Sequence, residues 1–302
     1  MNKVIVGLEG GGTKTGCAVL DERGTLLAYA EGGPANLNFV SEAVQRESFE
    51  TAIEGALQGI EAPVLALGYT VAGSRANWDW VLQRLGNPVA IPVEEPRMAF
   101  VSTGSLYAHG IAVVAGTGSI LAAFKADQLV RVVGGWGSLL GDEGSAYDVA
   151  IQALRAAARA WDGRDSETKL VQAALRYFKV RQLDELIPLF YQQGVPRHQV
   201  AGFAQKVVRL AEQGDRKAQA IVVTSAFILA HDAIACARGL FQPEDAFRVA
   251  ITGGMFRGRT LFRKTFEVCF LEAFPHANLR TPLMQPAVAV AKIAWQRVKG
   301  KR

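Results

Sequence analysis

The sequence predicts an α/β protein built from two domains of similar plan. Three short apolar segments, residues 4–8, 111–115 and 247–251, are each followed by a turn that contains glycine. After the first two turns a second apolar segment begins, which is the pattern of a β-hairpin. Stretches with helical spacing of apolar residues lie between and after these strands. The chain has 302 residues, which is enough for two domains with a substantial core.

The first part of the chain alternates strands with helices. Apolar runs and the turns between them predict strands at 4–8, 17–20, 26–30, 64–71 and 89–93, and helices at 41–59, 77–85 and 96–108. The first three strands form an antiparallel start, because glycine-containing turns separate them. This order is that of a mixed α/β domain of about 110 residues.

The second part begins with strands and then becomes strongly helical. We expect strands at 111–115, 119–125, 128–133 and 247–251, and helices at 142–161, 166–177, 183–193, 198–213, 216–239, 261–274 and 286–298. The segment 216–239 is long and apolar, which suits a helix buried against a sheet.

Composition excludes several classes of protein. Half of the residues are hydrophobic and 20% are charged, which is typical of a globular protein. No apolar run reaches the roughly 18 residues of a membrane span, and the first strand begins too early to leave room for a signal peptide. The three cysteines, Cys17, Cys236 and Cys269, form no C-x-x-C pair, so we expect neither disulfides nor a zinc site. These features predict a cytoplasmic protein that does not bind membranes.

The net charge of +5 comes from scattered lysines and arginines. A nucleic-acid-binding protein would show a basic face with aromatic residues or a known module. We therefore expect no nucleic-acid partner. The four histidines show no metal-site spacing.

The glycine turns are candidate phosphate sites. Gly10, Gly11 and Gly12 precede Thr13, Lys14 and Thr15, and glycines let an anion approach the backbone closely. Successive amides form a concave anion nest, to which hydroxyl groups add donors. A P-loop is excluded because a strand follows the turn where a P-loop needs a helix. Any one such turn is equally well explained as an ordinary hairpin.

A second turn, Gly116, Thr117, Gly118 and Ser119, repeats this arrangement, and a third contains Thr252, Gly253 and Gly254. Together the three predict two phosphate-binding turns and one nucleoside-binding turn. That combination is the plan of a nucleotide-dependent phosphotransferase with its cleft between two similar domains.

Four motifs carry a resemblance to a known family: EGGGTKT (9–15), GTGS (116–119), GGWGSLLGDEGSAYDVA (134–150) and TGG (252–254). In this order and spacing the chain resembles the N-acetylglucosamine and glucosamine kinases of the BadF/BadG/BcrA/BcrD-type ATPases, in the sugar kinase and actin superfamily. The resemblance covers residues 3 to about 297. It implies two ribonuclease H-like (actin-like ATPase) domains with an interdomain cleft. Residues 1–113 and 283–302 would form the first, which the C-terminal helix closes, and 114–282 the second, with a helical insertion.

The cofactors that this plan implies are ATP and Mg²⁺. We expect the ATP phosphates to bind the two hairpin turns, through Gly11, Gly12, Thr13, Lys14, Gly116, Thr117, Gly118 and Ser119. Gly253 and Gly254 would pack beneath the adenine or ribose. Glu9 ends the first strand and would hold Mg²⁺ through water, since this ion favours one or two carboxylates and keeps several waters. The plain alternatives are a charged strand end for Glu9 and a solvated turn residue for Lys14.

The catalytic base departs from the family pattern. The family has an aspartate that opens a helix of form D-A-x-x-A, and spacing from Ala99 and Gly116 places Glu95 at that position. Glutamate is one methylene longer, and a misplacement of about 1 Å can cost roughly 10²-fold in rate. The alternative is that Glu95 is a first-turn charge on a helix with an early proline.

The resemblance also implies a sugar pocket. Asn36 would hydrogen-bond sugar hydroxyls, and Trp136, Ser138, Asp142 and Ser145 would face the sugar and its 2-substituent. The alternative for Asp142 is a helix N-cap. For Trp136 it is a core aromatic, although the glycines on both sides favour an exposed ring.

These observations predict ATP-dependent phosphorylation of glucosamine or N-acetylglucosamine at the 6-hydroxyl. A homodimer is possible. One alternative is a catalytically weak or inactive sugar or nucleotide sensor, because a glutamate replaces the family's aspartate. The other is an ATPase activator of a dehydratase, which would ligate an iron–sulfur cluster with closely placed cysteines, and the three cysteines lie at none of those positions.

Overall fold

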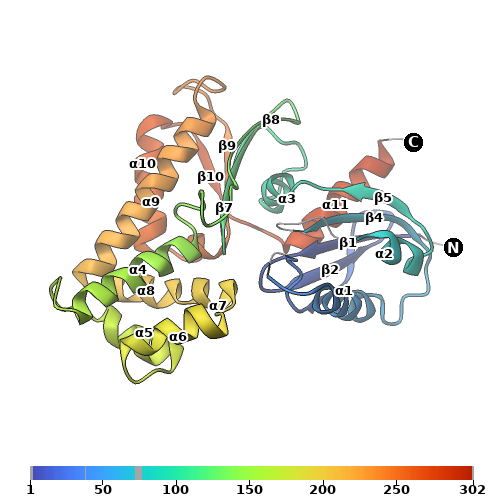
Figure 1. The fold of residues 1–302 in the computed structure, drawn as a ribbon. Helices are drawn as coiled ribbons and strands as arrows, with labels where there is room; N and C mark the ends of the chain where they lie inside the picture. Colours follow the sequence, from blue (N-terminus) through green and yellow to red (C-terminus); the bar gives the residue numbers. More distant parts are fainter. Residues whose placement is uncertain (1–2, 38, 72–76, 301–302) are drawn as a thin grey trace. The chain divides into compact units, whose positions relative to one another are not determined.

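The computed structural model describes residues 3–37, 39–71 and 77–300 (Figure 1). The chain divides into two compact units: residues 1–108 with 281–302, and residues 109–280. Each unit contains one five-stranded sheet, and both sheets mix parallel and antiparallel neighbours. The predicted α/β class is therefore confirmed.

The sheet of the first unit contains β1 (Val4–Gly10), β2 (Thr15–Leu20), β3 (Leu26–Gly32), β4 (Val64–Val71) and β5 (Val89–Pro92). Its order is β3-β2-β1-β4-β5. The first three strands are antiparallel, as expected, whereas β4 and β5 run parallel to β1. The carboxyl ends of β1, β4 and β5 therefore lie at one edge of the sheet, where loops can bring functional groups together.

Helices cover both faces of this sheet. The helix α1 (Glu42–Leu57) packs on one face, and its N-cap Ser41 accepts a hydrogen bond from the Val44 amide. The C-terminal helix α11 (Pro286–Lys299) packs on the other face, together with α3 (Glu95–Ser102). A β-carbon on Gly7 would lie 2.3 Å from the Ala287 carbonyl oxygen, so α11 crosses β1 in close contact. The remaining helix of this unit is α2 (Asp79–Arg84).

The second unit repeats the strand plan of the first. Its sheet contains β6 (Gly110–Ala115), β7 (Ser119–Lys125), β8 (Gln128–Gly134), β9 (Arg248–Thr252) and β10 (Asn278–Arg280), in the order β10-β9-β6-β7-β8. Again the hairpin strands are antiparallel, β7 to both β6 and β8, whereas β9 and β10 run parallel to β6. The two glycine turns, β1 to β2 and β6 to β7, thus occupy equivalent positions in the two sheets.

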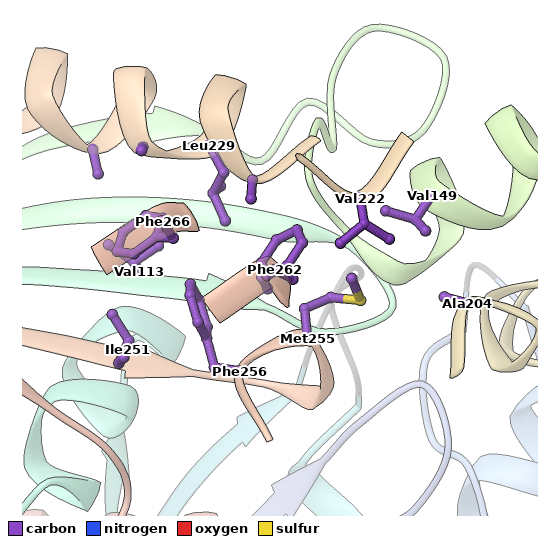
Figure 2. Close-up of a cluster of buried hydrophobic side chains, with 14 of the residues drawn as sticks. Val113, Val149, Ala204, Val222, Leu229, Ile251, Met255, Phe256, Phe262 and Phe266 are labelled. Atoms are coloured by element: carbon purple, nitrogen blue, oxygen red, sulfur yellow. The ribbon is translucent and has the colours of Figure 1, made fainter. Parts of the chain in front are cut away.

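One large core holds the second unit together. The helices α4 (Ala146–Trp161), α8 (Ala204–Glu212), α9 (Arg216–Ala237) and α10 (Leu261–Ala273) contribute to it with β6, β7 and β9. Figure 2 shows Phe256, Phe262 and Phe266 in this core, where the ring of Phe256 lies 5.7 and 5.0 Å from the other two. Within the described part of the chain, α9 alone is long and apolar enough to cross a membrane, and one of its faces, with Val222, Ala226 and Leu229, packs in this core.

The helical insertion is less regular than the sequence predicts. After α5 (Leu170–Phe178), the segment predicted as one helix at 183–193 forms three short turns, η1 (Leu183–Glu185), α6 (Leu186–Pro188) and η2 (Leu189–Gln193). The predicted helix 198–213 is divided at Phe203 into α7 (Arg197–Gly202) and α8. The predicted helix 142–161 begins only at Ala146. Two short elements, η3 (Gly254–Phe256) and β10, were not predicted.

Candidate functional site

The glycine turn of the first unit presents a backbone amide. The Gly11 amide donates to the Lys14 carbonyl over 2.8 Å, which closes the turn, and the Gly11 carbonyl accepts from the Ala35 amide over 3.0 Å. The N–H and C=O groups of a trans peptide point in opposite directions. The Gly12 amide is therefore directed away from Ala35. Beside it, Thr13 is exposed.

Glu9 lies next to this turn and is partly buried. A β-carbon on Gly11 would lie 3.3 Å from Glu9 Oε1. Burial is the main cause that raises the pKa of Glu9 to about 8. The negative charges of Glu95 and Glu31 also raise this pKa, whereas the positive charge of Lys14 lowers it. A divalent cation would offset this cost, because it stabilises the charged form of a carboxylate.

The described residues contain no group of three or more His, Cys, Asp or Glu side chains that could hold a metal ion. The role expected for Glu9, which is to hold Mg²⁺ through water, stays a prediction.

A short polar chain fixes Lys14. Its ammonium group forms an ion pair with Glu31, and the Tyr29 hydroxyl donates to the same carboxylate over 2.7 Å. In the sheet, Gly16 stands between Glu9 and Glu31, and a β-carbon there would lie 3.1 Å from the Tyr29 hydroxyl oxygen. Lys14 holds the pKa of Glu31 below its ordinary value, assisted by Tyr29. Sequence reasoning did not single out Tyr29 and Glu31, although their alternate positions place them on one face of β3.

Glu95 is the first residue of α3 and follows the carboxyl end of β5. The Val93 amide donates to the Tyr69 carbonyl over 2.9 Å, which ties this connection to β4. Of the two adjacent glutamates, Glu95 is the one whose charge raises the pKa of Glu9. Glu94 forms a 3.6 Å ion pair with Arg97 and is half exposed. Glu95 is thus near enough for its charge to act on the Glu9 carboxyl.

Asn36 is buried in the loop after β3. Its carbonyl accepts from the Phe39 and Val40 amides, over 2.9 and 3.1 Å. The loop is held from below by α1, because Ser48 Oγ donates to the Pro34 carbonyl over 2.8 Å and Gln45 donates to the Ala35 carbonyl. A buried amide side chain on an anchored loop suits a ligand contact that needs defined geometry.

The turn of the second unit presents two amides in one direction. The Gly116 and Thr117 carbonyls accept from the Ala146 and Tyr147 amides, over 2.9 and 3.4 Å, so both carbonyls face the N-terminus of α4. The amides of Thr117 and Gly118 must then point away from α4. A β-carbon on Gly116 would meet no atom within 4 Å. This open, amide-lined turn has the features of an anion-binding nest.

Asp142 lies against this turn. Its Oδ1 accepts from the Ser119 amide over 3.0 Å, and its Oδ2 forms an ion pair with Arg197. A β-carbon on Gly118 would lie 2.9 and 3.0 Å from the two carboxylate oxygens. Sequence reasoning missed Arg197, since one arginine far along the chain carries no signal of its partner.

Ser145 caps α4, so the N-cap alternative for Asp142 is wrong. Its Oγ accepts from the Asp148 amide over 3.2 Å, and the residue is fully buried. Asp142 instead has φ of +65° in the loop before the helix, and its carbonyl accepts from the Ser145 amide over 3.1 Å.

The loop between β8 and α4 exposes large apolar side chains. Trp136, Leu139 and Leu140 are 74, 96 and 77% exposed, and Ser138 is exposed as well. The core alternative for Trp136 is therefore wrong. The loop begins beside the turn, because the Gly135 amide donates to the Ser119 carbonyl over 3.2 Å.

The two glycines after β9 differ in their surroundings. Gly253 has φ of +101°, and a β-carbon there would lie 2.2 Å from the Ala115 carbonyl oxygen. A β-carbon on Gly254 would meet nothing within 4 Å. Met255 and Phe256 are buried just beyond and fix the position of the turn (Figure 2). Gly253 thus packs against the end of β6, whereas Gly254 leaves open space beside it.

Sequence comparison finds two amino-sugar kinases that are similar to this chain. The N-acetyl-D-glucosamine kinase of Dictyostelium discoideum is 24% identical, over 97% of this chain and 98% of that protein. The N-acetylmuramic acid/N-acetylglucosamine kinase of Clostridium acetobutylicum is 29% identical, over 74% of this chain and 76% of that protein.

Among solved structures, a protein of Chromobacterium violaceum that is proposed to be an N-acetylglucosamine kinase has a TM-score of 0.75 and 26% identity. The match covers 97% of this chain and 99% of that one, and it confirms the predicted actin-like ATPase fold. The model of the BadF/BadG/BcrA/BcrD ATPase family matches residues 6–288. The chain therefore belongs to the BadF/BadG/BcrA/BcrD ATPase family.

Proposed function

We propose that the protein is an ATP-dependent kinase that acts in the cytoplasm and phosphorylates the 6-hydroxyl of glucosamine or N-acetylglucosamine. The observation that carries this proposal is the pair of amides at Thr117 and Gly118, which point away from α4 because their peptide carbonyls are held by its first residues. The chain is also similar to an amino-sugar kinase over nearly its full length. Phosphoryl transfer depends mostly on positioning and charge neutralisation, which such a turn supplies.

ATP would bind through backbone groups. The amides of Thr117 and Gly118 would receive phosphate oxygens in the second unit, and the Gly12 amide would do so in the first. The open side of Gly254 gives space for the adenine or ribose, while Gly253 keeps this turn packed on β6.

Glu9 would hold the hydrated Mg²⁺, whose charge neutralises the phosphates during transfer. Glu95 would accept the proton of the sugar hydroxyl on a carboxylate oxygen. Its place at the start of α3, from which its charge acts on Glu9, supports this role, and the half-exposed Glu94 is already paired with Arg97.

The predicted polar residues would bind the sugar. Asn36 is buried and held on an anchored loop. Each carboxylate oxygen of Asp142 has more than one lone pair, so it can still accept from a sugar hydroxyl. Trp136 and Ser138 are exposed and available to a ligand. Ser145 is buried and already occupied as a helix cap, so we propose that it acts by fixing Asp142.

A second candidate is a sugar or nucleotide sensor with weak catalysis. One specific observation favours it: a glutamate occupies the place of the family's aspartate base, at the start of α3. A longer side chain would displace the carboxylate from the acceptor hydroxyl.

A coupled assay of ADP release tests the two candidates. Glucosamine, N-acetylglucosamine, N-acetylmuramic acid and glucose are each supplied with ATP, with and without Mg²⁺, and Glu95→Gln serves as the control. The proposal requires Mg²⁺-dependent ADP release that an amino sugar stimulates and that Glu95→Gln abolishes. Binding of sugar by calorimetry without stimulated ADP release would establish the sensor instead.

A further inference from the structure

We propose that Arg197 is a positioning residue for the nucleotide site, which neutralises Asp142 beneath the Gly116–Ser119 turn so that the turn can bind the phosphates of ATP. The inference rests on the proposed function in one respect, the binding of ATP at this turn. The helical insertion, which contains none of the family motifs, would thereby contribute a residue to the nucleotide site.

The turn has a buried negative charge directly behind it. Asp142 is 5% exposed, and its Oδ1 accepts from the Ser119 amide over 3.0 Å. The carboxylate fits here because residue 118 is glycine. A β-carbon on Gly118 would lie 2.9 and 3.0 Å from the two carboxylate oxygens of Asp142. Ser119 therefore has no amide to offer a phosphate, and the donors of the turn are Thr117 and Gly118.

An unneutralised carboxylate in this position would repel a triphosphate. Like charges interact strongly where water is excluded, and ATP carries several negative charges. A site that binds phosphate next to a buried carboxylate therefore needs a cation held permanently at that carboxylate.

Arg197 is that cation. It is the first residue of α7, its side chain is 13% exposed, and it forms an ion pair with Asp142 Oδ2. Its guanidinium also lies over the ring of Tyr147, 4.9 Å from the centroid. Tyr147 is the residue whose amide holds the Thr117 carbonyl. Arg197 thus contacts Asp142 and Tyr147, two of the residues that hold the turn from behind.

Calorimetry with MgATP, MgADP and adenosine tests this role. Arg197→Met keeps much of the apolar stem over Tyr147 and removes the charge, and Arg197→Lys restores the charge. Arg164→Met is the matched control, because Arg164 is an exposed arginine of the same unit in an ion pair of its own with Asp162. We expect Arg197→Met to weaken MgATP binding by about 10 to 100-fold and adenosine binding by less than about 2-fold. Arg197→Lys should recover most of the affinity, and Arg164→Met should match the wild type.

The Asp142→Asn variant supplies a test of opposite sign, which holds even if Arg197→Met folds poorly. With Asn at this position the cation faces no carboxylate, so MgATP should bind at least as tightly as in the wild type. In this background Arg197→Met should have little further effect.

Equal losses of MgATP and adenosine binding in Arg197→Met, or an undiminished loss in the Asp142→Asn background, would show that Arg197 only stabilises the fold and would overturn the inference. A wild-type protein that binds no MgATP would refute the proposed function, and this inference with it. Binding by the wild type with no loss in Arg197→Met would refute the role of Arg197 alone.

Discussion

Two adjacent glycines after β9 should respond in opposite ways to the same substitution. In Gly253→Ala the new β-carbon would lie 2.2 Å from the Ala115 carbonyl oxygen and 2.4 Å from its carbon, and both are backbone atoms that cannot rotate away. In Gly254→Ala the methyl group would meet no atom within 4 Å. The pair therefore separates a glycine needed for packing from one that leaves room for a ligand.

The magnitude for Gly253→Ala follows from its backbone and its contacts. With φ of 101° and ψ of 170°, Gly253 lies in a region that is almost confined to glycine, where a side chain costs about 1–3 kcal/mol. Forcing β6 away from β9 adds overpacking of a further 1–3 kcal/mol or so. We expect a loss of about 3–5 kcal/mol in the free energy of unfolding, against less than about 0.5 kcal/mol for Gly254→Ala.

Urea denaturation of both variants and calorimetry with adenosine check these values. Gly254→Ala should unfold at the wild-type urea concentration but bind adenosine about 10-fold more weakly, because its methyl group fills the proposed nucleoside space. A Gly253→Ala protein as stable as the wild type would refute the packing argument. Wild-type adenosine affinity in Gly254→Ala would remove this turn from the nucleotide site.

Three further predictions concern the first unit. The pKa of Glu9 is raised from 4.5 to about 8, so the folded state keeps a proton that the unfolded state has lost, and stability should fall as pH rises across that interval. Glu9→Gln should abolish this decline in stability, which is on the order of 5 kcal/mol at most. If the unfolding free energy of Glu9→Gln changes with pH as it does in the wild type, Glu9 is not the group that titrates. Glu95→Gln should lower kcat at least 10²-fold with little change in sugar affinity, and equal kcat would exclude Glu95 as the base. Lys14→Met should weaken MgATP binding about 10-fold; unaltered calorimetric affinity would mean that Lys14 serves only Glu31.

The fold class was predictable because local signals agree with the final architecture. Apolar runs and the turns between them predicted the five strands described in the first unit and four of the five described in the second, and residues 64–71 and 119–125 were predicted with the observed bounds. Errors arose where tertiary contacts override local pattern. The predicted helix 96–108 ends at Ser102, since Gly104 has φ of +96°. The short strand β10 is defined by its pairing with β9, which no local periodicity reveals. The predicted domain limits at 113/114 and 282/283 stay a prediction, close to unit limits at 108/109 and 280/281.

The candidate site also has a part that the sequence predicts and a part that it does not. Backbone sites such as the Gly116–Ser119 turn follow from short motifs, because glycine spacing determines where amides can point. Side-chain partners do not, because ion pairs between distant segments depend on the folded geometry. Arg197 and Asp142 are 55 positions apart, and Lys14 and Glu31 are 17 apart. Neither pairing has a spacing that distinguishes it among the 33 lysines and arginines of the chain.

The position of α11 after the second unit in the sequence has a consequence for biosynthesis. About half of the buried residues in the cluster on its side of the first sheet come from this helix. Residues 109–280 are translated between the strands and their covering helix, a delay of roughly 10–35 s at usual elongation rates. During that time Ile5, Ala18 and Leu20 lack the part of their native cover that α11 supplies. The second unit is one continuous segment and can fold on the ribosome before α11 is made, so the N-terminal sheet, although it is synthesised first, is covered only after the second unit has been synthesised.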